Sequence, residues 1–351
     1  MLYRYQKEKE IKFKIISNSG YFTENGQGRL EDRGFVLKYE SPVKTGISEN
    51  DSVHAEFFIP ENIYSSEIKG KNKFYACRKG TGNQKVIILL HGFNSKQDQL
   101  GNFYYFIKKA LRNDCAVLFL NLPYHLNRTP AGEQSGQRLI NSRDSELLEF
   151  FDQSVKDIQK AMAILSNIFE PANCLKFYIC GLSLGGMVAA ITAAWEPSLE
   201  KSVLLECGGN WDDIYWKSLI RIILRGTFID KTKIRRKEAA EFYAAHPAFI
   251  KEFKKVNPPL IDAGLESYPS LSAYRQKTMF LSDPLTFAHR VKTEKVLMIN
   301  AKFDILFCRA STEKLWAGLG KPEIKWLNDF HGTRVLANNS VIKKIFDFMD
   351  K

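Results

Sequence analysis

Short apolar runs recur along most of the chain and are separated by longer segments with a different periodicity. Val86–Leu90 reads VIILL and Ala116–Leu120 reads AVLFL, so nearly every side chain on either face would be apolar. Such runs are typical of strands that are buried on both faces, as in parallel sheets. Further runs of this kind predict strands at Leu175–Cys180, Ser202–Glu206, Val296–Asn300 and Ile324–Leu327.

Between these strands, apolar residues recur every three or four positions, which is the helical period. A repeated order of strand, helix and strand predicts an α/β fold, with a mostly parallel sheet and helices on both of its faces. The predicted helices are Gln99–Arg112, Asp144–Phe169, Leu184–Trp195 and Ser340–Met349. Nearer the N-terminus, alternating segments predict antiparallel strands that lead into this sheet, at Ile11–Ile16, Phe35–Tyr39, Val53–Ile59 and Phe74–Cys77.

The regular alternation stops between residues 211 and 290, where the sequence becomes basic and helical and is interrupted by prolines. We interpret residues 211–290 as a helical cap inserted near the carboxyl ends of the strands, where open α/β sheets bind ligands. Residues 81–210 and 291–351 then form the core, and residues 1–80 extend it. In the cap, apolar positions from Trp211 to Ile223 alternate with a basic stripe that includes Lys217 and Arg221. This pattern fits either a lid helix or a helix that makes peripheral contact with anionic lipid.

Composition removes several classes of protein. The 351 residues are 44% hydrophobic, which excludes a disordered chain, and no apolar run approaches the ~20 residues of a bilayer-spanning helix. The first fourteen residues mix charges with isolated apolar residues and do not resemble a secretory signal, so we expect a cytoplasmic protein. The six cysteines are widely spaced, which predicts neither disulfides nor a metal site. The net charge of +12 comes without a basic block or a nucleic-acid-binding motif, so we expect no nucleic-acid partner.

The sequence GLSLGG at residues 181–186 lies directly between a predicted strand and a predicted helix. A Gly-x-Ser-x-Gly turn in this position forces the serine into a strained backbone and lifts its hydroxyl above the edge of the sheet. Side chains in place of Gly181 and Gly185 would clash in so tight a turn. Ser183 is therefore the predicted nucleophile.

A nucleophilic serine also needs hydrogen-bond donors for the oxyanion that its attack creates. In sites of this kind, one N–H comes from the residue after the serine and another from the loop after an earlier strand. These positions are Leu184 and Phe93, the latter in the HGF sequence that follows Val86–Leu90. His91 in the same loop is interpreted as a structural histidine rather than as the catalytic base.

The serine must lose its proton to a base that an acid orients, and on this fold the chain order is serine, acid, histidine. His331 follows the predicted strand Ile324–Leu327 and is the expected base, because the other two histidines after Ser183 fall in the cap. Asp304 follows Val296–Asn300 and is the favoured acid. Glu206, at the end of the strand after the nucleophile's strand, is the alternative acid, and Asp283 is a weaker third candidate.

The chain resembles the α/β-hydrolase superfamily over residues 91–331, through the sequences HGF, GLSLGG, AKFD and DFHG. The turn at residues 121–125, NLPYH, together with GLSLGG, is similar to the dienelactone-hydrolase and prolyl-oligopeptidase side of this superfamily. The resemblance implies a mostly parallel sheet of eight strands and a triad of Ser183, Asp304 and His331. It implies hydrolysis of an ester-type bond in a small molecule through a serine acyl-enzyme, most simply by a carboxylesterase without cofactor or metal. A lipid or thioester hydrolase, a small-peptide hydrolase, a lyase or haloperoxidase-like enzyme and a non-catalytic binding protein remain alternatives.

Substrate contacts are predicted only in the loop after Ala116–Leu120. His125 and Arg128 lie there, near the same edge of the sheet, and either could meet an anionic or hydroxylated substrate group. Arg128 has a second interpretation, in which it pairs with a carboxylate at residues 143–146.

Overall fold

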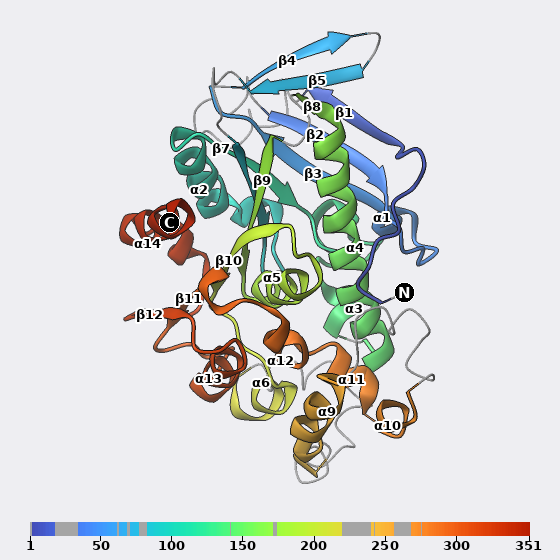
Figure 1. Cartoon of the computed structure of the whole chain (residues 1–351), viewed down its shortest axis with the longest axis vertical. Helices are drawn as coiled ribbons and strands as arrows, with labels where there is room; N and C mark the ends of the chain where they lie inside the picture. Colours follow the sequence, from blue (N-terminus) through green and yellow to red (C-terminus); the bar gives the residue numbers. More distant parts are fainter. Residues whose placement is uncertain are drawn as a thin grey trace.

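The computed structural model describes residues 2–17, 34–61, 63–68, 71–76, 83–140, 142–170, 174–219, 240–241, 243–255, 268–274 and 276–351. A central sheet with helices on both faces dominates this part of the chain (Figure 1). Its strands, in spatial order, are β1 (Phe13–Ser17), β2 (Gly34–Glu40), β3 (Ser52–Phe58), β7 (Cys115–Leu120), β6 (Gln84–Leu90), β9 (Leu175–Leu182), β10 (Leu199–Leu205), β11 (Val296–Ala301) and β12 (Glu323–Leu327).

The sheet is mostly parallel, as the sequence predicts. The pairs from β7 through β6, β9, β10 and β11 to β12 are all parallel, whereas β1, β2 and β3 join at the β7 edge in antiparallel pairs. Within the described residues the sheet has nine strands, one more than the eight that the resemblance implied. The additional pairing at the edge runs from Phe13 opposite Tyr39 to Ser17 opposite Phe35.

Phe74 does not lie in this sheet, and here the prediction is wrong. Its strand, β5 (Lys71–Ala76), pairs with β4 (Ile63–Ile68) and β8 (Phe169–Glu170) in a small separate sheet at the top of Figure 1. Phe74 is fully buried there, stacked on Phe169 with ring centroids 5.4 Å apart and edge-on to Phe57 at 5.6 Å. These aromatic contacts hold β5 against the central sheet instead of within it. Cys77 lies outside the described residues.

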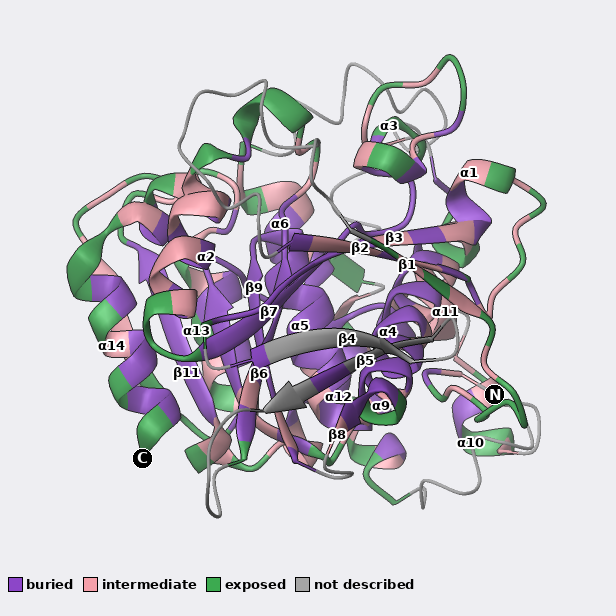
Figure 2. Ribbon diagram, turned by 90° about the horizontal axis from the view of Figure 1, so that it is seen from above, coloured by how far each residue is buried: buried purple, intermediate pink, exposed green. Residues whose placement is uncertain are grey.

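The helices that cover the sheet begin and end close to where the sequence places them. α4 (Asp144–Ile168) and α5 (Leu184–Trp195) cover one face, and α2 (Gly101–Arg112) and α14 (Asn339–Asp350) cover the other. In β6, Val86, Ile88 and Leu90 pack toward α4 and α5, while Ile87 and Leu89 pack toward α2 and α14. The strand is therefore buried on both faces (Figure 2).

The predicted cap is only partly described. Residues 220–239, 242, 256–267 and 275 lie outside the described part, and with them Ile223, Arg221 and most of the predicted basic stripe. The remainder is helical, in α6 (Trp211–Lys217), α9 (His246–Phe253), α10 (Pro269–Ser272), α11 (Lys277–Leu281) and α12 (Pro284–Phe287). α11 packs on α4 and α12 packs on α5, so these helices continue the layer that covers the sheet. α13 (Arg309–Gly318) completes the core.

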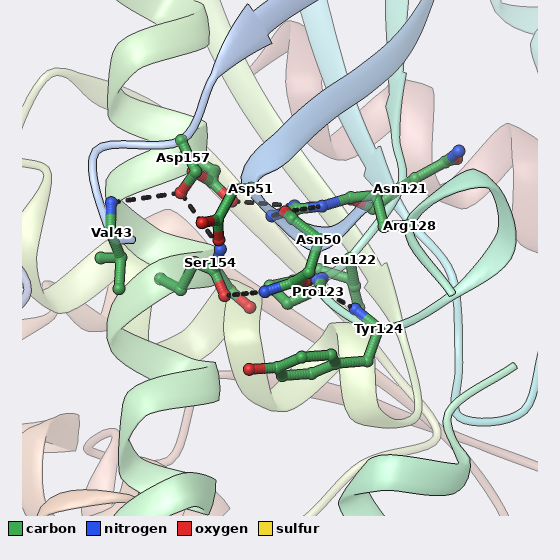
Figure 3. A network of polar contacts seen from close by, with 12 residues as sticks. Val43, Asn50, Asp51, Asn121, Leu122, Pro123, Tyr124, Arg128, Ser154 and Asp157 are labelled. Atoms are coloured by element: carbon green, nitrogen blue, oxygen red, sulfur yellow. Dashed lines mark hydrogen bonds and ion pairs between the residues drawn. The ribbon is translucent and has the colours of Figure 1, made fainter. Parts of the chain in front are cut away.

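Arg128 lies at the centre of a buried polar network that joins three parts of the fold (Figure 3). Its guanidinium donates from Nη1 to Asp157 Oδ2 in α4 at 2.8 Å and to the Asn121 carbonyl at 3.1 Å, and from Nε to the Asn50 carbonyl at 2.9 Å. Asp157 also accepts from the Ser41 hydroxyl at 2.7 Å. The predicted pairing of Arg128 with a carboxylate at residues 143–146 is wrong.

The side chains of Arg128 and Asp157 are both 0% exposed, so Arg128 has no free surface with which to meet a substrate. Burial raises the pKa of Asp157, and the Arg128 charge opposes that rise. Two buried charges that satisfy each other become costly when one of them is removed, because the other is left without a partner.

Arg128→Met should therefore lower the free energy of unfolding by about 3–5 kcal/mol, measured by urea denaturation. The matched control is Lys343→Met, which breaks an exposed pair with Asp347 on α14 and should cost at most about 0.5 kcal/mol. Equal losses in the two variants would show that the buried pair does not hold these segments together.

Candidate active site

Ser183 occupies the turn between β9 and α5 in a strained conformation. Its backbone has φ 57° and ψ −119°, a region that non-glycine residues rarely adopt. The turn is enforced by its neighbours, since a Cβ on Gly181 would lie 2.1 Å from the Gly185 carbonyl oxygen and a Cβ on Gly185 would lie 2.5 Å from that of His91. The Ser183 N–H donates to the Leu205 carbonyl at 2.8 Å and anchors the turn to β10.

The loop after β6 lies directly beside this serine. A Cβ placed on Gly92 would be 3.3 Å from the Ser183 Cβ and 3.8 Å from its hydroxyl oxygen. Among the hydrogen bonds of the described residues, none uses the N–H of Phe93 or of Leu184 as a donor. Leu184 is the first residue of α5, where backbone N–H groups lack partners inside the helix.

His91 ties this loop to the one that follows β7. Its Nε2 accepts from the Leu122 N–H at 3.0 Å, so its Nδ1 carries the proton and donates to the Gly92 carbonyl at 2.8 Å. Burial lowers the pKa of His91 to about 4, which keeps the ring neutral. With both nitrogens engaged, His91 acts as a structural histidine, as expected from its place in the sequence.

His125 is fully buried behind the same loop. Its ring lies 5.2 Å from that of His91 and 5.9 Å from that of Phe93, and its Nδ1–H donates to the Pro123 carbonyl at 2.7 Å. Burial lowers the pKa of His125 to about 3. His125, predicted as a substrate contact, therefore packs against the Phe93 ring inside the protein and does not face the solvent.

Asp304 and His331 meet at hydrogen-bond distance. The His331 Nδ1–H donates to Asp304 Oδ2 at 2.8 Å, while Asp304 Oδ1 accepts from the N–H groups of Leu306 and Phe307, each at 2.8 Å. The ring of Phe307 stacks on the imidazole at 5.9 Å. Both partners are thus held in orientation, and Nε2 is left as the nitrogen that can take a proton. The sequence did not identify Phe307, because nothing in the spacing shows which apolar residue packs on the histidine.

Glu206, the alternative acid, lies beside the same imidazole but is bonded elsewhere. Its Oε2 accepts from the Gly332 N–H at 2.6 Å and is 3.7 Å from His331 Nδ1, which is too long for a hydrogen bond. Burial raises the pKa of Glu206 to about 7, against the opposing influence of His331 and the Gly332 N–H. Asp283, the third candidate, instead accepts from the backbone N–H groups of Asn210 and Trp211.

The order of the strands explains why these residues lie near one another. Ser183, Glu206, Asp304 and His331 follow β9, β10, β11 and β12, which are consecutive and parallel, so their carboxyl ends share one edge of the sheet. In the described residues no hydrogen bond joins the Ser183 hydroxyl to His331. Two hydrogen bonds connect their loops: the Ser183 N–H donates to the Leu205 carbonyl, and the carboxylate of the adjacent Glu206 accepts from the Gly332 N–H.

Two features are absent from the described residues. No group of three or more histidine, cysteine, aspartate or glutamate side chains is arranged to hold a metal ion there. Of the helices in that part, none combines the length and the apolar character needed to cross a membrane.

Sequence comparison gives limited matches. No family model matches the chain. Over 133 residues it is 29% identical to the human monoacylglycerol lipase ABHD6, a match that covers 38% of this chain. The matched region spans 33% of the length of that curated relative.

Structural comparison covers nearly the whole chain. Acetyl xylan esterase 1 from Thermoanaerobacterium sp. JW/SL YS485 matches with a TM-score of 0.52 and 15% identity over 97% of this chain and 87% of that one. The acetyl xylan esterase from Paenibacillus sp. R4 matches with a TM-score of 0.52 and 11% identity over 97% and 89%. The acylaminoacyl peptidase from Pyrococcus horikoshii matches with a TM-score of 0.52 and 14% identity, over 91% of this chain and 41% of that one. Together with the sheet described above, these matches show the α/β-hydrolase fold.

The raised pKa of Glu206 makes the stability of the chain depend on pH. Between the ordinary glutamate value of 4.5 and about 7, the folded chain holds a proton that the unfolded chain has lost, so the free energy of unfolding falls as pH rises through this window. Glu206→Gln keeps an acceptor for Gly332 but carries no charge. The free energy of unfolding of this variant, relative to that of wild type, should rise by on the order of 2 kcal/mol from pH 5 to pH 8, measured by urea denaturation.

The exposed Glu61 provides the control, because Glu61→Gln removes a carboxylate that stays solvated in the folded chain. Its stability difference from wild type should not change over the same pH range. If Glu206→Gln and Glu61→Gln show the same pH dependence, the Glu206 carboxylate does not carry the proton inferred here.

Proposed function

We propose that this chain, with its α/β-hydrolase fold, is a serine hydrolase that cleaves carboxylic esters through Ser183, His331 and Asp304. The observation that carries the proposal is the 2.8 Å hydrogen bond between Asp304 and His331 at the edge of the sheet where Ser183 holds its strained turn. An acid that fixes the ring through Nδ1 leaves Nε2 to act as a base, which is what a serine nucleophile requires.

In the first step, the Ser183 oxygen attacks the ester carbonyl carbon while His331 Nε2 takes the hydroxyl proton. The carbonyl oxygen becomes an anion, and the N–H groups of Leu184 and Phe93 are assigned to stabilise it. The proximity of Gly92 to Ser183 supports this assignment, because Phe93 follows Gly92 directly. When the tetrahedral intermediate collapses, the bond to the alcohol breaks, the alcohol takes the proton from His331, and Ser183 carries the acyl group.

The second step reverses these roles with water in place of the alcohol. His331 takes a proton from water, the resulting hydroxide attacks the acyl carbon, and Ser183 recovers its proton as the acid leaves. Asp304 keeps its negative charge throughout and stabilises the imidazolium that forms twice in the cycle. Its second oxygen, held by Leu306 and Phe307, keeps the carboxylate from rotating away.

An ester is the substrate class that the comparisons favour. The curated relative is a monoacylglycerol lipase and two of the similar structures are acetyl xylan esterases, whereas the third is an acylaminoacyl peptidase. A carboxylesterase is the simplest activity that accommodates the first three, with lipid esters as the nearest variant and peptide amides as the more distant one.

The nucleophile is tested by labelling with a fluorophosphonate, which requires an activated serine but little fit to a substrate. Wild type should label, Ser183→Ala should not label, and His331→Ala should label at least about a thousandfold more slowly because the hydroxyl keeps its proton. Ser340→Ala, which removes an exposed hydroxyl at the start of α14, is the control and should label as wild type does. A folded wild type that stays unlabelled would favour a non-catalytic binding protein on the same fold.

The choice of acid is tested by turnover of a chromogenic short-chain ester. Asp304→Asn should lower kcat/KM by about 10³–10⁴-fold, since the amide cannot stabilise the imidazolium and favours the wrong tautomer. Glu206→Gln, which retains an acceptor for the Gly332 N–H, should lower it by about tenfold at most. The opposite ranking of the two variants would assign the acid to Glu206.

A further inference from the structure

Among the described residues, large apolar side chains are exposed at five positions, and four of these lie in or contact the loops of Asp304 and His331. In the described residues, exposed fractions of 45–59% are reached at Leu219, Phe303, Ile305 and Phe330, and Ile16 reaches 47%. Phe303 and Ile305 flank Asp304 in the chain, and Phe330 directly precedes His331. Ile16 lies elsewhere, on β1 at the opposite edge of the sheet from β12.

We call Leu219, Phe303, Ile305 and Phe330 the apolar rim. Contacts between side chains or between backbones join the segments that carry them. The rings of Phe303 and Phe330 lie 5.7 Å apart. The Phe303 N–H donates to the Asp329 carbonyl at 3.2 Å, so the loop that carries Asp304 is bonded to the loop that carries His331. The Leu219 N–H donates to the Ile305 carbonyl at 2.8 Å and joins the end of α6 to the same loop.

An apolar rim of this kind indicates a contact surface. Single exposed apolar side chains are common, but neighbouring ones that are exposed together mark sites where another surface binds. Three of the four rim residues are next to Asp304 or His331 in sequence, so whatever covers the rim also lies beside these two residues. A substrate presented from such a surface would arrive beside the imidazole of His331, the proposed base.

The charges beside the rim identify the kind of surface that fits it. Lys302 precedes Phe303, Arg334 lies in the turn that follows His331, and Lys217 ends α6. The side chains of Arg334 and Lys217 stay 73% and 45% exposed although they contact Asp329 and Asp213. Basic residues around exposed aromatic rings are typical of proteins that bind an anionic lipid surface. A second copy of this chain, with its own net charge of +12, would bring like charges together instead.

We propose that the apolar rim binds the surface of an anionic lipid bilayer and that the site draws its substrate, an ester of a lipid acyl chain, from that surface. The binding step needs only the rim and the neighbouring basic side chains, whereas the assignment of the substrate rests on the function proposed above. Leu219, Phe303, Ile305 and Phe330 would enter the interface, and Lys302 and Arg334 would face the lipid headgroups.

Binding is measured by co-sedimentation with vesicles, using Ser183→Ala so that no lipid is hydrolysed. The parent should bind vesicles that contain phosphatidylglycerol more tightly than vesicles of phosphatidylcholine alone, and added salt should weaken that binding. Phe303→Ser with Phe330→Ser should weaken binding to the anionic vesicles at least about fivefold. The matched control, Ile16→Ser, removes an equally exposed apolar side chain away from the rim and should bind within about twofold of the parent.

Three results would overturn the proposal. The first is that the parent does not bind the anionic vesicles. The second is that Phe303→Ser with Phe330→Ser and Ile16→Ser weaken vesicle binding equally. The third is that the parent is a dimer in solution and the Phe303→Ser and Phe330→Ser changes make it a monomer. Circular dichroism of each variant shows whether it is folded. The binding assay needs no catalysis. If the parent binds vesicles but wild type is not labelled by the fluorophosphonate, the lipid-binding proposal stands and only the esterase function is rejected.

Discussion

The candidate site depends on one steric constraint, the absence of space around the turn at Ser183. Neither Gly181 nor Gly185 has room for a Cβ, because each would collide with a backbone carbonyl oxygen at 2.5 Å or less. The chain can pass from β9 into α5 only with Ser183 at a positive φ, and the cost of that conformation is offset by the packing of both elements. Once the turn is fixed, the start of α5 and the loop after β6 must face the serine hydroxyl.

The groups around this turn are held by polar contacts that are themselves buried. His91 joins the loop after β6 to the loop after β7, His125 packs behind Phe93, and Glu206 connects the end of β10 to the loop of His331. Burial keeps both histidines neutral and raises the pKa of Glu206, so near neutral pH the framework carries few charges that compete with those of a reaction. Such prearrangement is what allows fixed dipoles to act on a developing charge.

The sequence predicts those features that depend on local pattern. Strands buried on both faces, the helices between them and the turn at Ser183 are all visible in residue order, and the described structure contains them. Features that depend on contacts between distant segments are not visible. The pairing of Arg128 with Asp157, the placement of β5 in a separate sheet and the bond between Glu206 and Gly332 join residues 29, 95 and 126 positions apart, and local spacing does not encode them. Nor could the sequence show that His125 is buried against Phe93, because its burial depends on side chains from other segments that pack around it.

The polar network around Arg128 has a consequence for the order in which the chain can fold. Asn50 bonds to Arg128 and to Gln153, residues that lie 78 and 103 positions further along the chain. Strand β3 likewise has its partner β7 at residues 115–120. During synthesis the first three strands therefore emerge well before β7 and α4, and the Asn50 side chain can bond to Gln153 only after α4 has been made. Contacts of such long sequence separation slow folding, so the N-terminal strands should be among the last parts of the central sheet to dock.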